Sequence, residues 1–127
     1  MGLKTLIVDD DDIVVFIHRL ILKDSGISDV PLIFRNGKTA YDYISGHTEE
    51  PCLVFLDLNM PIMDGWQFLD LIEDSSFLIS VVIVSSSIDP ADLQKATTYS
   101  KVIRFVEKPL SVKVCDEIRN GHDYIFT

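Results

Sequence analysis

Five polar side chains stand within two residues of the ends of short apolar runs, and their types suit chemistry on a phosphoryl group. They are Asp9, Asp10, Asp57, Ser85 and Lys108. Crowded carboxylates raise one another's pKa, and a hard divalent cation such as Mg²⁺, which takes oxygen ligands, removes that penalty. A carboxylate can attack phosphorus to form an acyl phosphate, while a lysine ammonium neutralises charge on the transferring group. If folding brings the five together, they predict a Mg²⁺ site for phosphoryl transfer, in which the serine hydroxyl hydrogen-bonds a phosphoryl oxygen.

The chain alternates between apolar runs and segments with helical period. The runs, which predict strands, are residues 6–8, 32–34, 53–56, 81–84 and 102–106. Four of them are continuously apolar, as strands are when helices cover both faces of a sheet. The predicted helices are residues 12–23, 38–45 and 65–74, a helix that begins at Asp89 and Pro90, and residues 111–119.

The first predicted helix has an apolar stripe that we expect to face the core. The stripe comprises Ile13, Phe16, Ile17, Leu20 and Ile21. Gly26 is placed to end this helix. His18 stands beside Arg19 in an ordinary amphipathic segment, so we expect it at the surface or half-buried rather than in a chemical role.

Alternating strands and helices predict one α/β domain over residues 1–127, a doubly wound, five-stranded parallel sheet with helices on both faces. Ligands of such sheets bind beyond the carboxyl ends of the strands, where strand order reverses. In the common order 2-1-3-4-5, the flavodoxin-like arrangement, that point lies between the first and third strands. Asp9, Asp10 and Asp57 would then meet in one pocket, with Ser85 and Lys108 close by.

The net charge and the apolar runs of the chain bear on which partners it can bind and where it is located. The net charge of −9 repels nucleic acid and anionic membranes, so neither is expected as a direct partner. No apolar run approaches the roughly 20 residues that cross a bilayer, and the N-terminus lacks the features of a signal peptide. We therefore predict a cytoplasmic protein, in which Cys52 and Cys115 are reduced core residues.

Four motifs together resemble the receiver domains of two-component response regulators, in the same order and over essentially the whole chain. They are Leu6-Ile7-Val8-Asp9-Asp10, the stretch from Leu56-Asp57-Leu58-Asn59-Met60-Pro61 to Met63-Asp64-Gly65, Val84-Ser85-Ser86 and Lys108-Pro109. The length is similar to that of single-domain regulators, including the chemotaxis type, which have no output domain. In the third motif Ser85 and Ser86 are followed by Ser87, where a variable residue usually stands.

The resemblance implies a role for each matching residue. Asp57 corresponds to the phosphoacceptor, and Lys108 to the lysine that binds the phosphoryl group, with a cis bond to Pro109. The implied metal ligands are Asp10, Asp57 and the backbone carbonyl of Asn59, with Asp9 reaching the metal through water. Ser85 and Phe105 correspond to the switch residues, the hydroxyl that follows the phosphoryl group and the aromatic ring that reports it.

The resemblance also implies a function. A phosphohistidine on a sensor histidine kinase or a histidine phosphotransfer protein would give its phosphoryl group to Asp57, with Mg²⁺ as cofactor. The altered surface, including the helix after Asp89, would then bind a downstream protein. Such a chain is not an enzyme beyond its own phosphorylation and slow dephosphorylation, and we expect a monomer or weak dimer.

Two other functions fit parts of the pattern. A Mg²⁺-dependent phosphohydrolase carries its nucleophile on the first strand in a D-x-D pattern, which residues 9–12 could mimic. An interaction module on the same fold would bind neither metal nor phosphate. Taken singly, the residues also have simpler explanations, since aspartates cap helices or form turns and most lysines are solvated.

Overall fold

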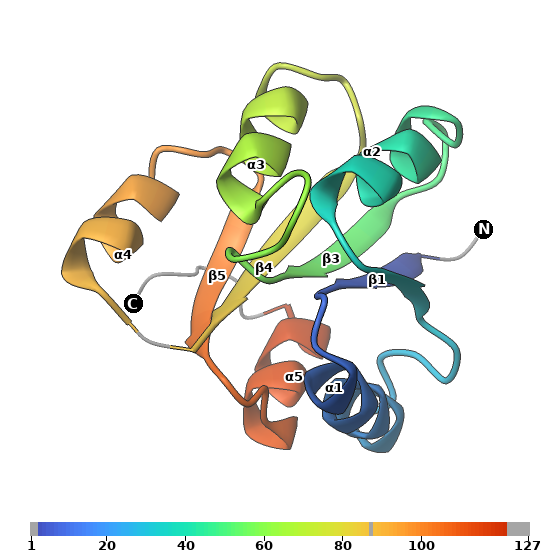
Figure 1. Cartoon of the computed structure of the whole chain (residues 1–127). Helices are drawn as coiled ribbons and strands as arrows, with labels where there is room; N and C mark the ends of the chain where they lie inside the picture. Colours follow the sequence, from blue (N-terminus) through green and yellow to red (C-terminus); the bar gives the residue numbers. More distant parts are fainter. Residues whose placement is uncertain (1–2, 87, 122–127) are drawn as a thin grey trace.

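The computed structural model describes residues 3–86 and 88–121, in which five strands form one parallel sheet. The strands are β1 (Lys4–Val8), β2 (Leu32–Phe34), β3 (Cys52–Leu56), β4 (Ile79–Ser85) and β5 (Val102–Glu107). Their order across the sheet is β2-β1-β3-β4-β5 (Figure 1). The predicted fold class and strand order are confirmed, and the order reverses between β1 and β3 as expected.

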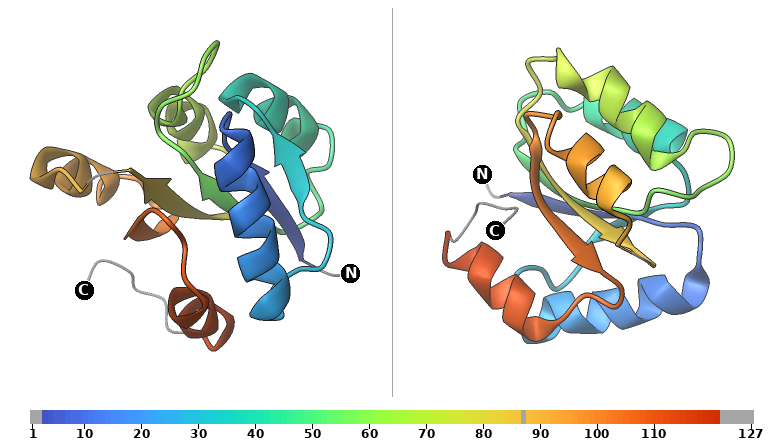
Figure 2. Two further views of the ribbon diagram at one scale, coloured as in Figure 1. Left: turned by 60° about the horizontal axis from the view of Figure 1, so that its bottom comes forward. Right: turned by 90° about the vertical axis from the view of Figure 1, so that its left-hand side faces the viewer.

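Helices cover both faces of this sheet. They are α1 (Asp12–Asp24), α2 (Gly37–Ser45), α3 (Gly65–Glu73), α4 (Pro90–Ala96) and α5 (Val112–Arg119). Figures 1 and 2 show α1 and α5 side by side on one face, with α2 and α3 on the other. Ala96 of α4 joins the core on the α2 and α3 side.

The continuous apolar runs are explained by two cores, one on each face of the sheet. Because side chains alternate along a strand, Val54 and Leu56 of β3 enter the core under α2 and α3, while Leu53 and Phe55 enter the core under α1 and α5. All five residues of β3 are buried. Full burial of such a side chain stabilises the fold by about 1.5–3 kcal/mol, so both helical layers are held to the sheet.

The ends of the helices follow the local sequence. Side-chain oxygens accept hydrogen bonds from free backbone N–H groups at the start of all five helices, and the capping residues are Asp11, Asn36, Asp64, Asp89 and Ser111. Each such cap is worth about 1 kcal/mol. Gly26 has φ of +80° just after α1, a conformation that favours glycine, and it ends the helix as predicted.

The prediction that the apolar stripe of α1 faces the core is wrong. The buried residues of α1 are Val15, His18 and Leu22. Ile13, Phe16, Ile17 and Leu20 are exposed, and of the predicted stripe only Ile21 is partly buried. The helix carries apolar residues on several sides, so two stripes satisfy the helical period, and packing against the sheet and α5 decides between them.

The expected surface or half-buried position of His18 is therefore also wrong, because its side chain is only 2% exposed. Cys52 and Cys115 are buried and free, as predicted. Ser87 lies outside the described residues. Among the residues that the structure describes, no helix is long and apolar enough to cross a bilayer.

Candidate functional site

The first and third strands bring three carboxylates together at the switch point of the sheet. Val8 and Leu56, the last residues of β1 and β3, are paired in register, so Asp9 and Asp57 leave the sheet side by side. The Asp57 N–H donates to the Val8 carbonyl (2.9 Å). Asp9, Asp10 and Asp57 each offer one carboxylate oxygen, and these oxygens lie within 4.8 Å of one another. The predicted convergence of the acidic strand ends is confirmed.

The three carboxylates have different surroundings. Asp9 and Asp57 are buried, at 2% and 6% exposure, whereas Asp10 is exposed. Asp9 Oδ1 accepts a hydrogen bond from the Asp11 N–H (2.9 Å), and the Asp57 carboxylate accepts one from the backbone N–H of Asn59. The cluster is thus a buried pair with one solvated member at its mouth.

Lys108 supplies the positive charge of the site. Its Nζ lies 3.1 Å from Asp9 Oδ2 and 3.3 Å from Asp57 Oδ1, so one ammonium bridges both buried carboxylates. The Lys108 N–H donates to the Ser85 carbonyl (2.7 Å), which ties the end of β5 to the end of β4. The Lys108–Pro109 peptide bond is cis, as the family resemblance implied.

The carboxylates of the pocket carry more negative charge than Lys108 neutralises. Burial raises the pKa of Asp57, the negative charge of Asp9 raises it further, and Lys108 and the Asn59 N–H only partly oppose them. Burial by itself would lower the pKa of Lys108, but its hydrogen bonds and charge interactions with Asp9 and Asp57 outweigh burial, so the pKa is raised. A further cation would relieve the repulsion between the carboxylates.

The donor set fits a hard divalent ion. Three carboxylates offer oxygen atoms at one point, one of them open to water, and among the described residues this is the group of acidic, histidine or cysteine side chains placed to hold a metal. Mg²⁺ favours a few carboxylates together with waters and phosphate oxygens. Asn59 is exposed and adjoins the cluster through its backbone; the ligand role of its carbonyl stays a prediction.

The two predicted switch residues lie on the neighbouring strands. Ser85 is the last residue of β4 and is buried. Its carbonyl accepts the hydrogen bond from the Lys108 N–H. Phe105 pairs with Ile83 across β4 and β5, is partly buried, and packs against the core on the α2 and α3 side. Ser85 and Phe105 thus lie on β4 and β5, the two strands that run from the edge of the carboxylate cluster and are joined by α4. Their role as switch residues stays a prediction.

The connection from β3 to α3 is tightly built beside Asp57. A Cβ added to Gly65 would lie 2.6 Å from the Asp57 carbonyl oxygen and 2.9 Å from Leu58 Cα, so the glycine permits this close approach. Ile62 has φ of +68°, and the Met63 N–H donates to the Pro61 carbonyl (2.7 Å) around it. This is a γ-turn of the rare positive-φ form, which strains a β-branched residue.

Sequence reasoning missed one residue near the site. His18 Nε2 accepts a hydrogen bond from the Leu110 N–H (3.2 Å), which lies two residues beyond Lys108. The available signal was the spacing of Val15, His18 and Leu22, which repeats with helical period. The apolar stripe beside it gave a stronger signal and concealed this one.

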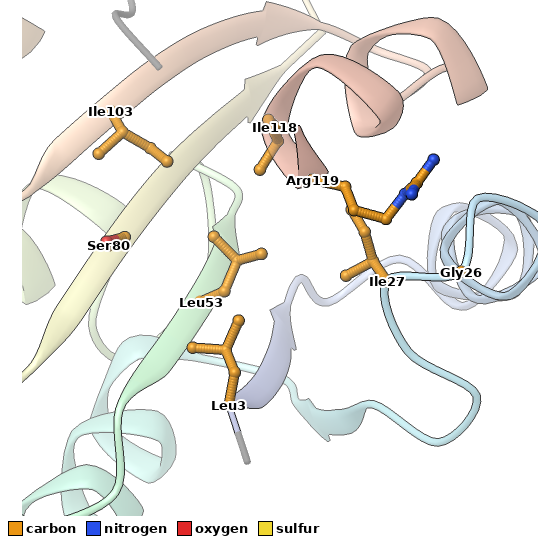
Figure 3. A pocket seen from close by; sticks show the side chains of 8 residues that line it. All are labelled: Leu3, Gly26, Ile27, Leu53, Ser80, Ile103, Ile118 and Arg119. Atoms are coloured by element: carbon orange, nitrogen blue, oxygen red, sulfur yellow. The ribbon is translucent and has the colours of Figure 1, made fainter. Parts of the chain in front are cut away.

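A separate pocket of about 320 Å³ lies at the opposite end of the sheet (Figure 3). Leu53, Ser80 and Ile103, which line it, are each the second residue of their strand. Arg119 is the charged member of its described lining. The mostly apolar lining and the remote position separate this pocket from the carboxylate site.

Comparison with known proteins agrees with this geometry. A family model for the response regulator receiver domain matches residues 5–118. The chain belongs to this family. The receiver domain is 32% identical to the rice (Oryza sativa subsp. japonica) two-component response regulator ORR41 over 109 residues, which cover 86% of this chain and 85% of that protein. Accepting a phosphoryl group is the family's role, and it accounts for the carboxylates and the lysine that meet at the carboxyl ends of β1, β3 and β5.

Solved structures share the fold. A crystal structure of a two-component response regulator from Cytophaga hutchinsonii superimposes with a TM-score of 0.83 at 28% identity, covering 93% of this receiver domain and 94% of that chain. Other relatives are longer. A protein-glutamate methylesterase/protein-glutamine glutaminase from Myxococcus xanthus is 27% identical over 110 residues, which are 87% of this chain and 31% of that protein. The matched region is thus most of the length of one relative and about a third of another.

Proposed function

We propose that this receiver domain accepts a phosphoryl group on Asp57 from a phosphohistidine of a sensor histidine kinase or a histidine phosphotransfer protein, with Mg²⁺ as cofactor. The observation that carries the proposal is the Lys108 ammonium lying between Asp9 and Asp57 in a three-carboxylate cluster. This arrangement provides a nucleophile, a metal-binding set and a cation for the transferred group within one pocket.

We assign the acceptor role to Asp57 rather than Asp9 because Asp57 corresponds to the phosphoacceptor in the family's motif. The contacts do not separate the two carboxylates, since each accepts a backbone N–H, from Asn59 or Asp11, and each contacts Lys108. An Asp57 oxygen attacks phosphorus as the bond from phosphorus to the donor imidazole breaks, and the imidazole leaves with its electron pair. Asp10, Asp57 and the Asn59 carbonyl, with Asp9 through water, would hold Mg²⁺, which would supply positive charge for the phosphoryl oxygens. Lys108 Nζ stabilises the negative charge that reaches those oxygens.

Phosphorylation would change the surface through β4 and β5. The new oxygens on Asp57 attract the Ser85 hydroxyl, and Phe105 follows on the paired strand. Next to these strands α4 contacts α3 through Lys95, whose Nζ lies 4.4 Å from the centre of the Trp66 ring. We propose that this α4 surface binds the downstream protein.

The exposed stripe of α1 provides a surface for the phosphodonor. Ile13, Phe16, Ile17 and Leu20 form an apolar helix face that the described part of the chain leaves uncovered, and Phe16 is 63% exposed. The helix begins at Asp12, directly after the acidic cluster, so a protein that brings a histidine to Asp57 meets this stripe. An apolar contact of this kind favours a protein donor over a small phosphate ester.

The rest of the proposal follows from the predicted class. The chain would act as a single receiver domain over residues 1–127, in the cytoplasm, as a monomer or weak dimer. It would have no enzymatic activity beyond transfer to and loss from its own aspartate.

Mass spectrometry of the protein incubated with Mg²⁺ and acetyl phosphate tests the acceptor. The wild-type protein should gain one phosphoryl mass and Asp57→Asn none, and equal labelling of the variant would disprove the assignment. A phosphohydrolase would instead turn over a small phosphate ester, keep that activity in Asp57→Asn and lose it in Asp9→Asn. For an interaction module without metal, the melting temperature would stay flat as Mg²⁺ is titrated.

A further inference from the structure

His18 connects α1 to the segment that carries the site lysine. Its side chain is buried on the face of α1 that packs against the sheet, together with Val15 and Leu22. Its Nε2 accepts the Leu110 N–H at 3.2 Å, a contact between residues 92 positions apart. Leu110 is itself buried, at 1% exposure, so water cannot take over as the acceptor of this N–H.

The hydrogen bond defines the protonation state of the imidazole. A ring nitrogen accepts a hydrogen bond only when it carries no proton, so the contact assigns His18 as neutral with its proton on Nδ1. Burial lowers the pKa of His18, the charge of Lys108 acts in the same direction, and Asp9 opposes them. The neutral acceptor form is thus favoured although a carboxylate lies nearby.

We propose that His18 is a positioning residue for Lys108, a role that rests on the proposed phosphotransfer function. The lysine segment is held on both sides. The Lys108 N–H donates to the Ser85 carbonyl, and the Leu110 N–H donates to His18. These two anchors fix the backbone from which Lys108 Nζ reaches Asp9 and Asp57. Without the second anchor, the buried Leu110 N–H would have to move to find a new acceptor, and the lysine would move with it.

Substitutions at position 18 separate the acceptor from the packing. In His18→Gln the amide oxygen can accept the Leu110 N–H, whereas His18→Leu fills similar space without an acceptor. We expect His18→Leu to slow phosphorylation by acetyl phosphate at saturating Mg²⁺ by roughly tenfold, because a misplacement of about 1 Å can cost up to about 100-fold. His18→Gln should recover most of the wild-type rate. Mg²⁺ affinity should not fall in either variant, since the carboxylates stay in place.

Two controls distinguish positioning from general loss of stability. Val15→Ala removes packing from the same face of α1 without touching the hydrogen bond, so it should lower the melting temperature and leave the phosphorylation rate unchanged. In a Lys108→Ala background, His18→Leu should cause no further loss of rate, because the group that it positions is gone. A further tenfold loss in that background would show that His18 acts elsewhere and would overturn the proposal.

Nuclear magnetic resonance gives a readout that does not depend on activity or on the variants folding. In the wild-type protein, long-range ¹H–¹⁵N spectra of the His18 ring should show the Nδ1–H tautomer between pH 6 and 8. An Nε2–H tautomer or a charged ring at pH 7 would refute the proposal. Wild-type protein that takes up no phosphoryl group would instead refute the proposed function. Wild-type rates in His18→Leu would refute only the positioning role.

Discussion

Replacing the Asp57 carboxylate by an amide should stabilise the metal-free receiver domain, although it removes an ion pair. The substitution Asp57→Asn keeps an oxygen that can accept the Asn59 N–H. Lys108 keeps a charged partner in this variant, because its Nζ remains 3.1 Å from Asp9 Oδ2. The usual large cost of breaking a buried ion pair arises from the charge left alone, and here no charge is left alone.

The size of the effect follows from the distances. At an effective dielectric constant of about 20, carboxylate oxygens within 4.8 Å of each other repel by at least about 3.5 kcal/mol, and Lys108 at 3.3 Å attracts Asp57 by about 5 kcal/mol. Asp10 is exposed, so its repulsion is nearer to about 1 kcal/mol. These charge interactions nearly cancel. The cost of burying the carboxylate remains, and because the pocket opens to water at Asp10 we take it as about 1–2 kcal/mol.

Thermal unfolding in excess EDTA measures this difference. For a domain of this size, a gain of about 1–2 kcal/mol corresponds to a melting temperature roughly 4–8 °C above that of the wild type. Asp29→Asn makes the same chemical change at an exposed carboxylate and should shift the melting temperature by less than about 2 °C. Addition of Mg²⁺ should stabilise the wild type more than Asp57→Asn, since the variant has lost a ligand. If Asp57→Asn melts at or below the wild type in EDTA, burial and repulsion do not dominate at this site and the reasoning fails.

Three further predictions concern the surroundings of the site. Gly65→Ala should destabilise the protein by about 1–3 kcal/mol in chemical denaturation, because its Cβ would meet the Asp57 carbonyl oxygen at 2.6 Å, whereas Gly46→Ala has no neighbour closer than 3.5 Å and should be tolerated. A stable Gly65→Ala would contradict the close approach. Ile62→Asn should raise the free energy of unfolding by about 1 kcal/mol in the same assay, because asparagine adopts φ of +68° with less strain. A lower free energy of unfolding would show that the exposed isoleucine is not strained. Trp66, the single tryptophan, should change its fluorescence on phosphorylation as the lysine of α4 leaves its ring, and an unchanged spectrum in the phosphorylated protein would argue against movement of α4.

The predictable parts of this protein are those determined by local rules. Continuous apolar runs identified the strands because both faces of the sheet are covered, and the capping residues Asp89 and Ser111 identified helix starts. The position of Asp9 and Asp57 followed from one topological rule, since adjacent parallel strands end at the same edge. The contact of Lys108 with both carboxylates depends on the tertiary structure, and the strand-end rule predicted only that this lysine lies close to the pocket.

The face of α1 shows where such reasoning fails. Its sequence offers two stripes of similar period, and the more apolar one, with Phe16 and Leu20, is exposed. The buried stripe contains a histidine, which apolar patterning assigns to the surface. A buried polar side chain is acceptable when it is hydrogen-bonded, and the partner of His18 is a backbone N–H 92 residues away that no local pattern reveals.

The two exceptions to local patterning on α1 have one physical explanation. A core that consisted only of apolar side chains could not satisfy the Leu110 N–H, because the chain turns there between β5 and α5 and this N–H finds its acceptor on another element. Turning the histidine face of α1 inward supplies that acceptor, and this rotation necessarily leaves Phe16 and its apolar neighbours at the surface. The same rotation therefore holds the lysine segment in place and presents an apolar face beside the acidic cluster. On this argument, restoring an all-apolar buried stripe with His18→Leu should leave α1 packed and helical by circular dichroism while the Leu110 amide loses its protection from hydrogen exchange. Unchanged protection of that amide would show that the histidine is not what holds the segment.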